Sequence, residues 1–192
     1  MPVILPTPPT PPSLSDPANF DARTDAFLSW MTDLSVTWNA SPPLLVEDIT
    51  TLWSAAKRTK STAQSIPDGV FTIITYDTLD YDKLGELDAT GRFTAQNDGI
   101  YHISAGLISA DAIWATGEVW QITLYKNGSR YANGYRTVAN AALAENFHST
   151  LGTDMELVAG DYIDIRAYSE AGVTVDTLPD PRYNYFSVHR VS

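Results

Sequence analysis

The sequence predicts an all-β protein, an antiparallel jelly-roll sandwich preceded by a proline-rich extended segment and one α-helix. From about Trp53 onward, short stretches such as residues 100–107 and 119–125 alternate apolar and polar side chains. This period of two is typical of strands with one buried face. Asn-Gly and Asp-Gly pairs separate these stretches and supply the positive φ angles that tight turns require. Eight or more short strands without intervening helices are typical of sandwiches and jelly rolls.

Individual strands and turns can also be placed. Residues 70–76, with the sequence VFTIITY, are expected to form one buried strand. The turns are expected at Asn97-Asp98-Gly99, Lys126-Asn127-Gly128, Ala132-Asn133-Gly134 and Ala159-Gly160-Asp161.

Composition limits the classes of partner. Only 18% of the 192 residues are charged, below the usual quarter, so we expect much of the surface to be covered by other chains. The net charge is −11, which makes nucleic acid and membrane surfaces poor partners. Lys57, Arg58 and Lys60 form a small basic cluster, either a solvated strand edge or a site for a polyanion. No apolar run reaches the ~20 residues of a membrane span, and the N-terminus lacks the features of a signal peptide.

The first 54 residues divide into three predicted segments. Seven prolines lie among residues 2–17, and because proline fixes φ and removes an amide donor, residues 1–15 are expected to form an extended anchor strap. Residues 16–40 are expected to be a helix, residues 41–54 a linker, and residues 55–192 the jelly roll. Pro6, Pro8 and Pro9 are candidate contacts of the strap with another protein.

The helix is expected to carry an apolar seam. Phe20, Phe27 and Leu34 fall in one column of a heptad, and Thr24, Met31 and Trp38 fall in the other. Two interpretations stay open: an amphipathic helix that packs on its own domain, or a docking helix or short trimeric stalk. Under the second, the anchor residues are Phe20, Phe27, Met31 and Leu34.

Four motifs, in order, resemble the complement 1q/tumour-necrosis-factor-like superfamily. They are Gly91-Arg92-Phe93-Thr94 continuing to Gly99-Ile100-Tyr101, then Leu124-Tyr125-Lys126-Asn127-Gly128, Leu157-Val158-Ala159-Gly160-Asp161, and Tyr185-Phe186-Ser187-Val188. Gln96 stands where the superfamily usually has proline. Phe93 and Tyr101 are expected to fill the two ends of the core, and Gly160-Asp161 to close a hairpin. The resemblance also implies a homotrimer, with Tyr183 and Tyr185 as candidate interface residues.

The N-terminal segment has a second resemblance. The proline-rich strap followed by Ser15-Asp16-Pro17-Ala18-Asn19-Phe20 is similar to the start of many tailed-phage fibre and tail-associated proteins. It implies a virion protein, made in the host cytoplasm, that is either a tail-fibre or receptor-binding component or a head fibre or capsid decoration protein. A polysaccharide depolymerase is a third hypothesis, but the paired carboxylates that it needs have no signature here. We expect no enzymatic activity.

Metal and ligand sites have only weak candidates. Asp77, Asp80 and Asp82 could hold calcium or form an ordinary solvated acidic loop. The three histidines have no metal-ligand spacing, and no other cofactor is expected. Trp114, in an expected loop, and Tyr131, Tyr135 and Arg136, beside an expected hairpin, are candidate contacts to a host glycan or protein. Alternatively, these aromatic side chains pack against a neighbouring subunit.

Overall fold

The computed structural model describes residues 24–31 and 53–191, which fall in two separate units, Met1–Thr50 and Thr51–Ser192. In the first unit, residues 24–31 form an α-helix. It lies within the predicted helix, and the rest of that prediction, including Phe20 and Leu34, falls outside the described residues, as do Pro6, Pro8 and Pro9. Within the described part of the chain, no helix has the length and apolar composition of a membrane span.

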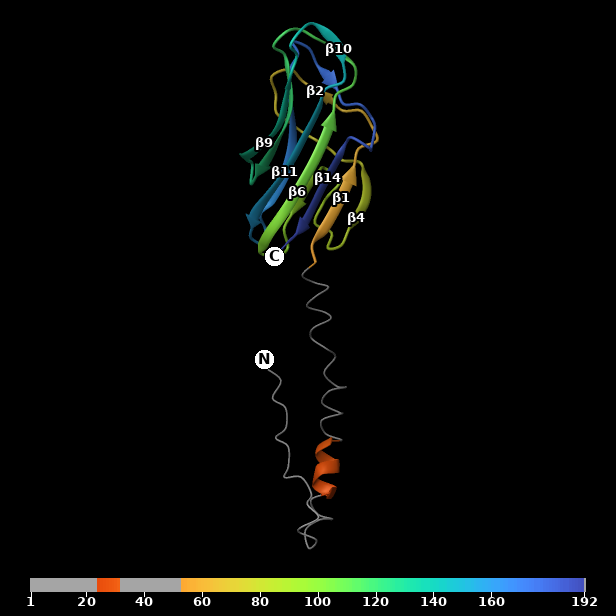
Figure 1. Cartoon of the computed structure of the whole chain (residues 1–192), viewed down its shortest axis with the longest axis vertical. Helices are drawn as coiled ribbons and strands as arrows, with labels where there is room; N and C mark the ends of the chain where they lie inside the picture. The colour runs from red at the N-terminus through yellow and green to blue at the C-terminus, as the bar shows by residue number, and fades with distance from the viewer. Residues whose placement is uncertain (1–23, 32–52, 192) are drawn as a thin grey trace. The chain divides into compact units, whose positions relative to one another are not determined.

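The second unit contains two five-stranded sheets. The first has the strand order β11-β6-β14-β1-β4 and faces the viewer in Figure 1. Its strands are β11 (His148–Leu157), β6 (Gly99–Ile108), β14 (Tyr185–Arg190), β1 (Ala55–Thr59) and β4 (Thr78–Asp82). All neighbouring strands in it are antiparallel.

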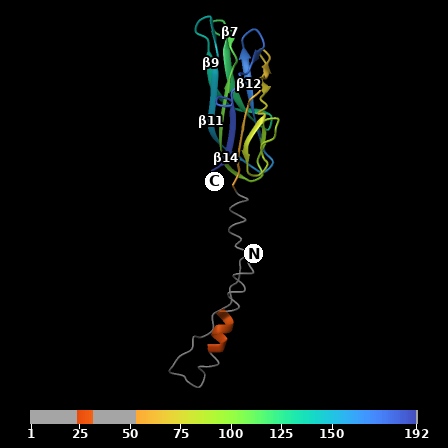
Figure 2. The same cartoon turned by 90° about the vertical axis from the view of Figure 1, so that its right-hand side faces the viewer.

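The second sheet has the order β3-β12-β8-β9, and β5 also pairs with β12. Its strands are β3 (Thr72–Ile73), β12 (Tyr162–Glu170), β8 (Val119–Lys126), β9 (Ser129–Val138) and β5 (Arg92–Thr94). Two short ladders complete the unit: β7 (Ala112–Trp114) with β10 (Leu143–Glu145), and β2 (Ser65–Ile66) with β13 (Val175–Asp176). Figure 2 shows the sandwich from the side, with β12 and β14 in its two layers. The predicted antiparallel jelly roll is confirmed.

The turn predictions have mixed outcomes. Asn127 (φ 50°) and Gly128 (φ 79°) form the predicted hairpin turn between β8 and β9. Gly160 (φ 92°) forms a turn, but the predicted hairpin is wrong, because β11 and β12 belong to different sheets. Ala132-Asn133-Gly134 is not a turn either. It lies inside β9, beside a shift in the β8–β9 register.

The strand predicted at residues 70–76 is shorter than expected. Only Thr72–Ile73 pairs with β12, and Val70 is 50% exposed. Ile74 and Tyr76 are fully buried, so the apolar run contributes to the core mostly as irregular chain. An apolar run alone does not distinguish a strand from a buried connection.

Aromatic side chains fill the core in two groups. Phe93 and Tyr101 are fully buried and pack edge to face, with ring centroids 5.7 Å apart. Phe93 and Tyr101 therefore lie in the same part of the core, and the expectation that they fill its opposite ends is wrong. The second group is Trp114, Trp120 and Phe147, with Trp114 stacked on Phe147 at 4.4 Å and edge-on to Trp120 at 6.4 Å.

Candidate functional site

Trp114 is not an exposed loop residue. It ends strand β7, is fully buried, and donates a hydrogen bond from Nε1 to the carbonyl of Glu145 at 2.9 Å. The expectation that it contacts a ligand is therefore wrong. The neighbouring Ile113 is the exposed residue, at 80%, because successive strand residues point to opposite faces.

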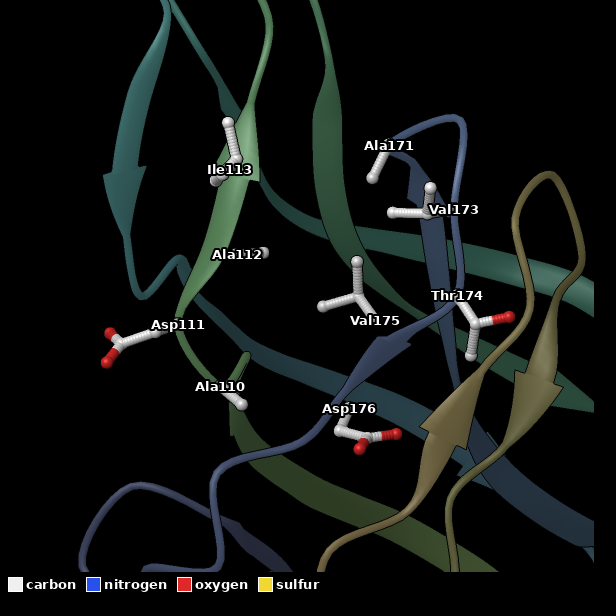
Figure 3. Close-up of a pocket in the computed structure, with 9 residues that line it drawn as sticks. All are labelled: Ala110, Asp111, Ala112, Ile113, Ala171, Val173, Thr174, Val175 and Asp176. Atoms are coloured by element: carbon white, nitrogen blue, oxygen red, sulfur yellow. The ribbon is translucent and has the colours of Figure 1, made fainter.

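A shallow hollow of about 480 Å³ lies beside β7. Figure 3 shows Val173 and Val175 pointing toward the gap that faces Ala112. Asp111 and Asp176 lie on opposite sides of it, and Asp176 accepts a hydrogen bond from Ser65 Oγ at 2.6 Å. The centre of the hollow is thus apolar, and its two carboxylates do not converge on a common point.

Tyr131, Tyr135 and Arg136 all lie on β9, which is an edge strand of the second sheet. Tyr131 is 51% exposed and Tyr135 is 67% exposed. An Arg136 guanidinium nitrogen lies 3.8 Å from a Glu170 carboxylate oxygen. These three residues are therefore accessible, as expected of ligand contacts, and their role stays a prediction.

Sequence reasoning missed a larger basic surface on the same sheet. We call it the arginine face, and it consists of Arg92, Arg130, Arg136 and Arg166 from three strands together with the rings beside them. Arg92 lies 4.1 Å from the ring centroid of Tyr162, Arg130 lies 4.1 Å from that of Phe71, and Arg166 lies 3.8 Å from that of Tyr125. Phe71 also stacks on Tyr168 at 4.5 Å.

One arginine of this face is neutralised within the chain. Arg166 Nε donates to Asp164 Oδ1 at 2.7 Å. This hydrogen bond, more than the opposing effect of burial, raises the pKa of Arg166. The pleat of the strand explains the contact, because residues two apart on β12 point to the same side of the sheet.

The outward side of the first sheet has a different character. We call it the histidine face, defined by His102, Ser104, Gly106, His148, Gly152, Ser187 and His189 on β6, β11 and β14. In the pairing register Ser104 stands between Gly152 and Ser187. The rings of His102 and His189 lie 5.2 Å apart, and His102 Nδ1 lies 2.6 Å from Asp154 Oδ1.

Tyr183 and Tyr185 border this face. The alternating residues Asn184 and Phe186 are fully buried, whereas Tyr183 is 42% exposed and Tyr185 is half-buried. The Tyr185 ring lies so close to Gly106 that a Cβ there would meet it at 2.6 Å. The two tyrosines therefore point away from the core, and a role in self-association stays a prediction.

The calcium candidates already have partners within the chain. Asp77 accepts hydrogen bonds from Ser61, Thr62 and Thr78. Burial opposes ionisation of Asp77, but these hydrogen bonds outweigh it and lower the pKa of Asp77. Asp80 pairs with Lys57 at 2.7 Å, and Asp82 accepts backbone amides from residues 85–87. Among the described residues, no group of three or more acidic, histidine or cysteine side chains is arranged to hold a metal ion.

The basic cluster at residues 57–60 is not a polyanion site. Arg58 Nε donates to the carbonyl of Leu87 at 3.0 Å, and Lys60 Nζ donates to the carbonyl of Thr75 at 2.9 Å. Lys60 is only 1% exposed, and its burial lowers its pKa. These cations serve the packing of β1.

In the helix, Phe27 is half-buried against Trp30, with ring centroids 5.8 Å apart, and Met31 is 50% exposed. The two predicted anchor residues within the described helix thus leave apolar surface accessible for a partner. Their role as virion contacts stays a prediction.

Comparison with known proteins bears on the jelly roll. No protein-family model and no curated protein matches the sequence. The solved structure of Eiger TNF from S. frugiperda matches with a TM-score of 0.51 at 13% identity, covering 73% of this chain and 93% of that one. The solved structure of murine APRIL at pH 8.5 also matches, with a TM-score of 0.51 at 13% identity, covering 72% of this chain and 99% of that one. The fold is tumour-necrosis-factor-like. At these identities the likeness concerns the fold alone.

Proposed function

We propose that the chain is a non-enzymatic attachment protein of a tailed-phage virion, a tail-fibre or receptor-binding component that displays a trimeric jelly-roll knob. The observation that carries the proposal is the position of the two ends of the sandwich. The chain enters it at β1 and leaves β14 at the same end, where Ala55 pairs with His189. Strands β2 and β10 lie at the opposite end (Figure 1), which is left free to meet a partner.

The histidine face supports self-association. Its central row consists of Gly152, Ser104 and Ser187, and such short side chains leave the backbone of the sheet open to close approach by another chain. Tyr183 and Tyr185 beside it provide aromatic contact area, which is typical of interfaces. A closed symmetric trimer of a chain with low charge content also agrees with the composition.

The first experiment locates the protein on the particle. Antibody fragments against the jelly roll, viewed on intact virions by electron microscopy, are expected to decorate the tail. Decoration of the capsid would instead identify a head fibre or capsid decoration protein. Particles without any label, or release of reducing ends from host polysaccharide by the purified chain, would overturn the proposal.

The helix gives a test of anchoring in the full-length chain. Replacing Phe27 and Met31 together by Asp places charge on the apolar surface and is expected to reduce incorporation into particles by about tenfold or more. Ala26→Asp with Ser29→Asp adds the same two charges at exposed positions of the same helix and is the matched control. Equal incorporation of the two variants would contradict the anchor role.

A further inference from the structure

The arginine face is built in register across the second sheet. Arg92 on β5 pairs with Asp164 on β12, Asp164 pairs with Tyr125 on β8, and Tyr125 pairs with Arg130 on β9. Since neighbouring strands lie about 4.8 Å apart, the Cα atoms of Arg92 and Arg130 are separated by about 14 Å along this row. The sheet thus places these two arginines at a fixed backbone separation, with Asp164, the partner of Arg166, between them.

Contacts with aromatic rings restrict the positions of these two guanidinium groups. Arg92 lies over Tyr162 and Arg130 lies over Phe71, each 4.1 Å from the ring centroid. A guanidinium whose plane packs on a ring keeps its N–H donors at its edge, where they remain available for a planar acceptor. Phe71 is held in turn by Tyr168. The two arginine side chains are therefore partly ordered before a ligand binds, which reduces the entropy lost on binding.

Neither group forms an ion pair within the described part of the chain, although the charge of Arg92 is one of the causes that lower the pKa of Asp88. Arg166 has Asp164 as its partner and Arg136 has Glu170 nearby. Among the described residues, Arg92 and Arg130 have no carboxylate within ion-pair distance. Half of the chain's eight arginines gather on this face, although the net charge of the chain is −11. Two ring-packed guanidinium groups without an ion-pair partner on such a protein indicate a specific anion rather than general attraction.

We propose that the arginine face binds an acidic polysaccharide through carboxylate groups, with Arg92 and Arg130 as the two contact points. A carboxylate matches the fork of a guanidinium with two parallel hydrogen bonds. The exposed Asn133, whose backbone pairs with Thr123 in the next row, provides an amide for sugar hydroxyls. This proposal rests on the proposed attachment function and names the class of its ligand.

Charge spacing favours a carboxylated sugar polymer over nucleic acid. Nucleic acid carries a phosphate about every 3.4 Å along each strand, and its affinity for proteins depends on neutralising many of them. A chain of net charge −11 opposes such a dense polyanion at long range. Two arginines whose Cα atoms lie about 14 Å apart, three strand spacings, suit a polymer whose charges are sparse.

The test titrates the full-length chain with hyaluronate, which carries a carboxylate on every second sugar, by calorimetry at low salt. Carboxyl-reduced hyaluronate and dextran are the uncharged probes, and polyphosphate is the densely charged one. We expect binding to hyaluronate only. Arg92→Gln with Arg130→Gln is expected to weaken it about tenfold or more, since each loses charge-assisted hydrogen bonds.

Two further variants separate fork geometry from charge. Arg92→Lys with Arg130→Lys keeps both charges but loses the planar fork, and it is also expected to weaken binding. Arg182→Gln removes an exposed arginine that pairs with Asp180 at 2.6 Å, away from this sheet, and is expected to bind as the unchanged chain does. Arg130→Gln alone, on an exposed edge strand, covers the case in which the Arg92 change disturbs folding.

Several results would overturn the proposal. They are absence of hyaluronate binding, equal binding of the carboxyl-reduced polymer, stronger binding of polyphosphate, or equal weakening by Arg182→Gln. A chain found on virions that fails these titrations would refute the polysaccharide assignment and leave the attachment function intact. A chain that binds hyaluronate but is missing from virions would refute the attachment function instead.

Discussion

The two outward faces of the sandwich share one backbone geometry and differ in side-chain length. Short residues such as Ser104 and Gly152 line the histidine face, whereas Arg92 and Arg130 extend over aromatic rings on the arginine face. Backbones can approach a surface of short side chains closely, but long cations held on rings keep another protein at a distance and offer hydrogen bonds to a small group. The difference teaches that one jelly roll can present two chemically distinct faces, to which the two proposals assign assembly and ligand binding.

A long charged side chain at the centre of the histidine face should have the largest effect. Ser104→Arg would bury three unpaired cations in the proposed trimer, which costs several kcal/mol. Sedimentation is expected to show monomers at micromolar concentration. Asn133→Arg, which makes the same addition to the arginine face, is expected to leave the trimer intact. Equal dissociation by both variants would remove the distinction between the faces.

Gly106→Ala is expected to have the next largest effect. The added Cβ would lie 2.6 Å from the Tyr185 ring and 2.7 Å from the carbonyl of Tyr183, and such overpacking costs about 2–3 kcal/mol. Urea unfolding measures the loss. Gly152→Ala is the control on the same face, because its Cβ would meet nothing within 4 Å. If both variants unfold at the same urea concentration, the close contact of Tyr185 with β6 is wrong.

On the arginine face the effect of a single contact should be smaller. A double-mutant cycle of Phe71→Leu and Arg130→Gln measures their coupling, which we expect to be about 0.5–1 kcal/mol for a cation over a partly exposed ring. The same cycle with Arg182 in place of Arg130 is expected to give no coupling. A coupling near zero in the first cycle would mean that the ring does not hold the guanidinium.

The smallest effect concerns the turn that joins β11 to β12 and thus the two sheets. Hydrogen bonds from Lys126, Asn127 and the Val158 amide lower the pKa of Asp161 to about 2. A depressed carboxylate pKa contributes stability above its unfolded value, about 3.9, and the contribution is lost as the pH falls through about 2. Asp161→Asn is therefore expected to unfold more easily at pH 7, by at most about 1 kcal/mol.

The measurement for Asp161 is urea unfolding at pH 7 and near pH 2. The difference between Asp161→Asn and the unchanged chain should shrink at the lower pH, where the carboxylate is becoming protonated. A difference that is the same at both values would show that the charge of Asp161 contributes nothing.

Local patterns predicted the fold because alternation and turn residues act over a few positions. The hairpin at Asn127-Gly128 was predictable for this reason, since its φ values need those residue types. The turn at Gly160 was placed correctly, but no local signal tells whether a turn stays in one sheet or crosses to the other. Trp114 was misplaced because β7 has only three residues, too few for a visible alternation.

The surfaces were less predictable because they join residues distant in sequence. Lys57, Arg58 and Lys60 are neighbours along the chain, yet Arg58 and Lys60 bond to backbone carbonyls of other segments. Arg92 and Arg130 lie far apart along the chain and come into one row only through the pairing of β5, β12, β8 and β9. Strand order, which the sequence alone does not provide, decides both which basic side chains bond within the chain and which ones gather on one face.

The central claim is that one sheet assembles the knob while the other remains open. Sedimentation equilibrium of the full-length chain at micromolar concentration tests it most directly. The account predicts a mass about three times the 21.0 kDa of one chain. When hyaluronate is added at less than one polymer per trimer, the mass should increase only by that of the bound polymer. A mass of 21.0 kDa for the protein alone would contradict it.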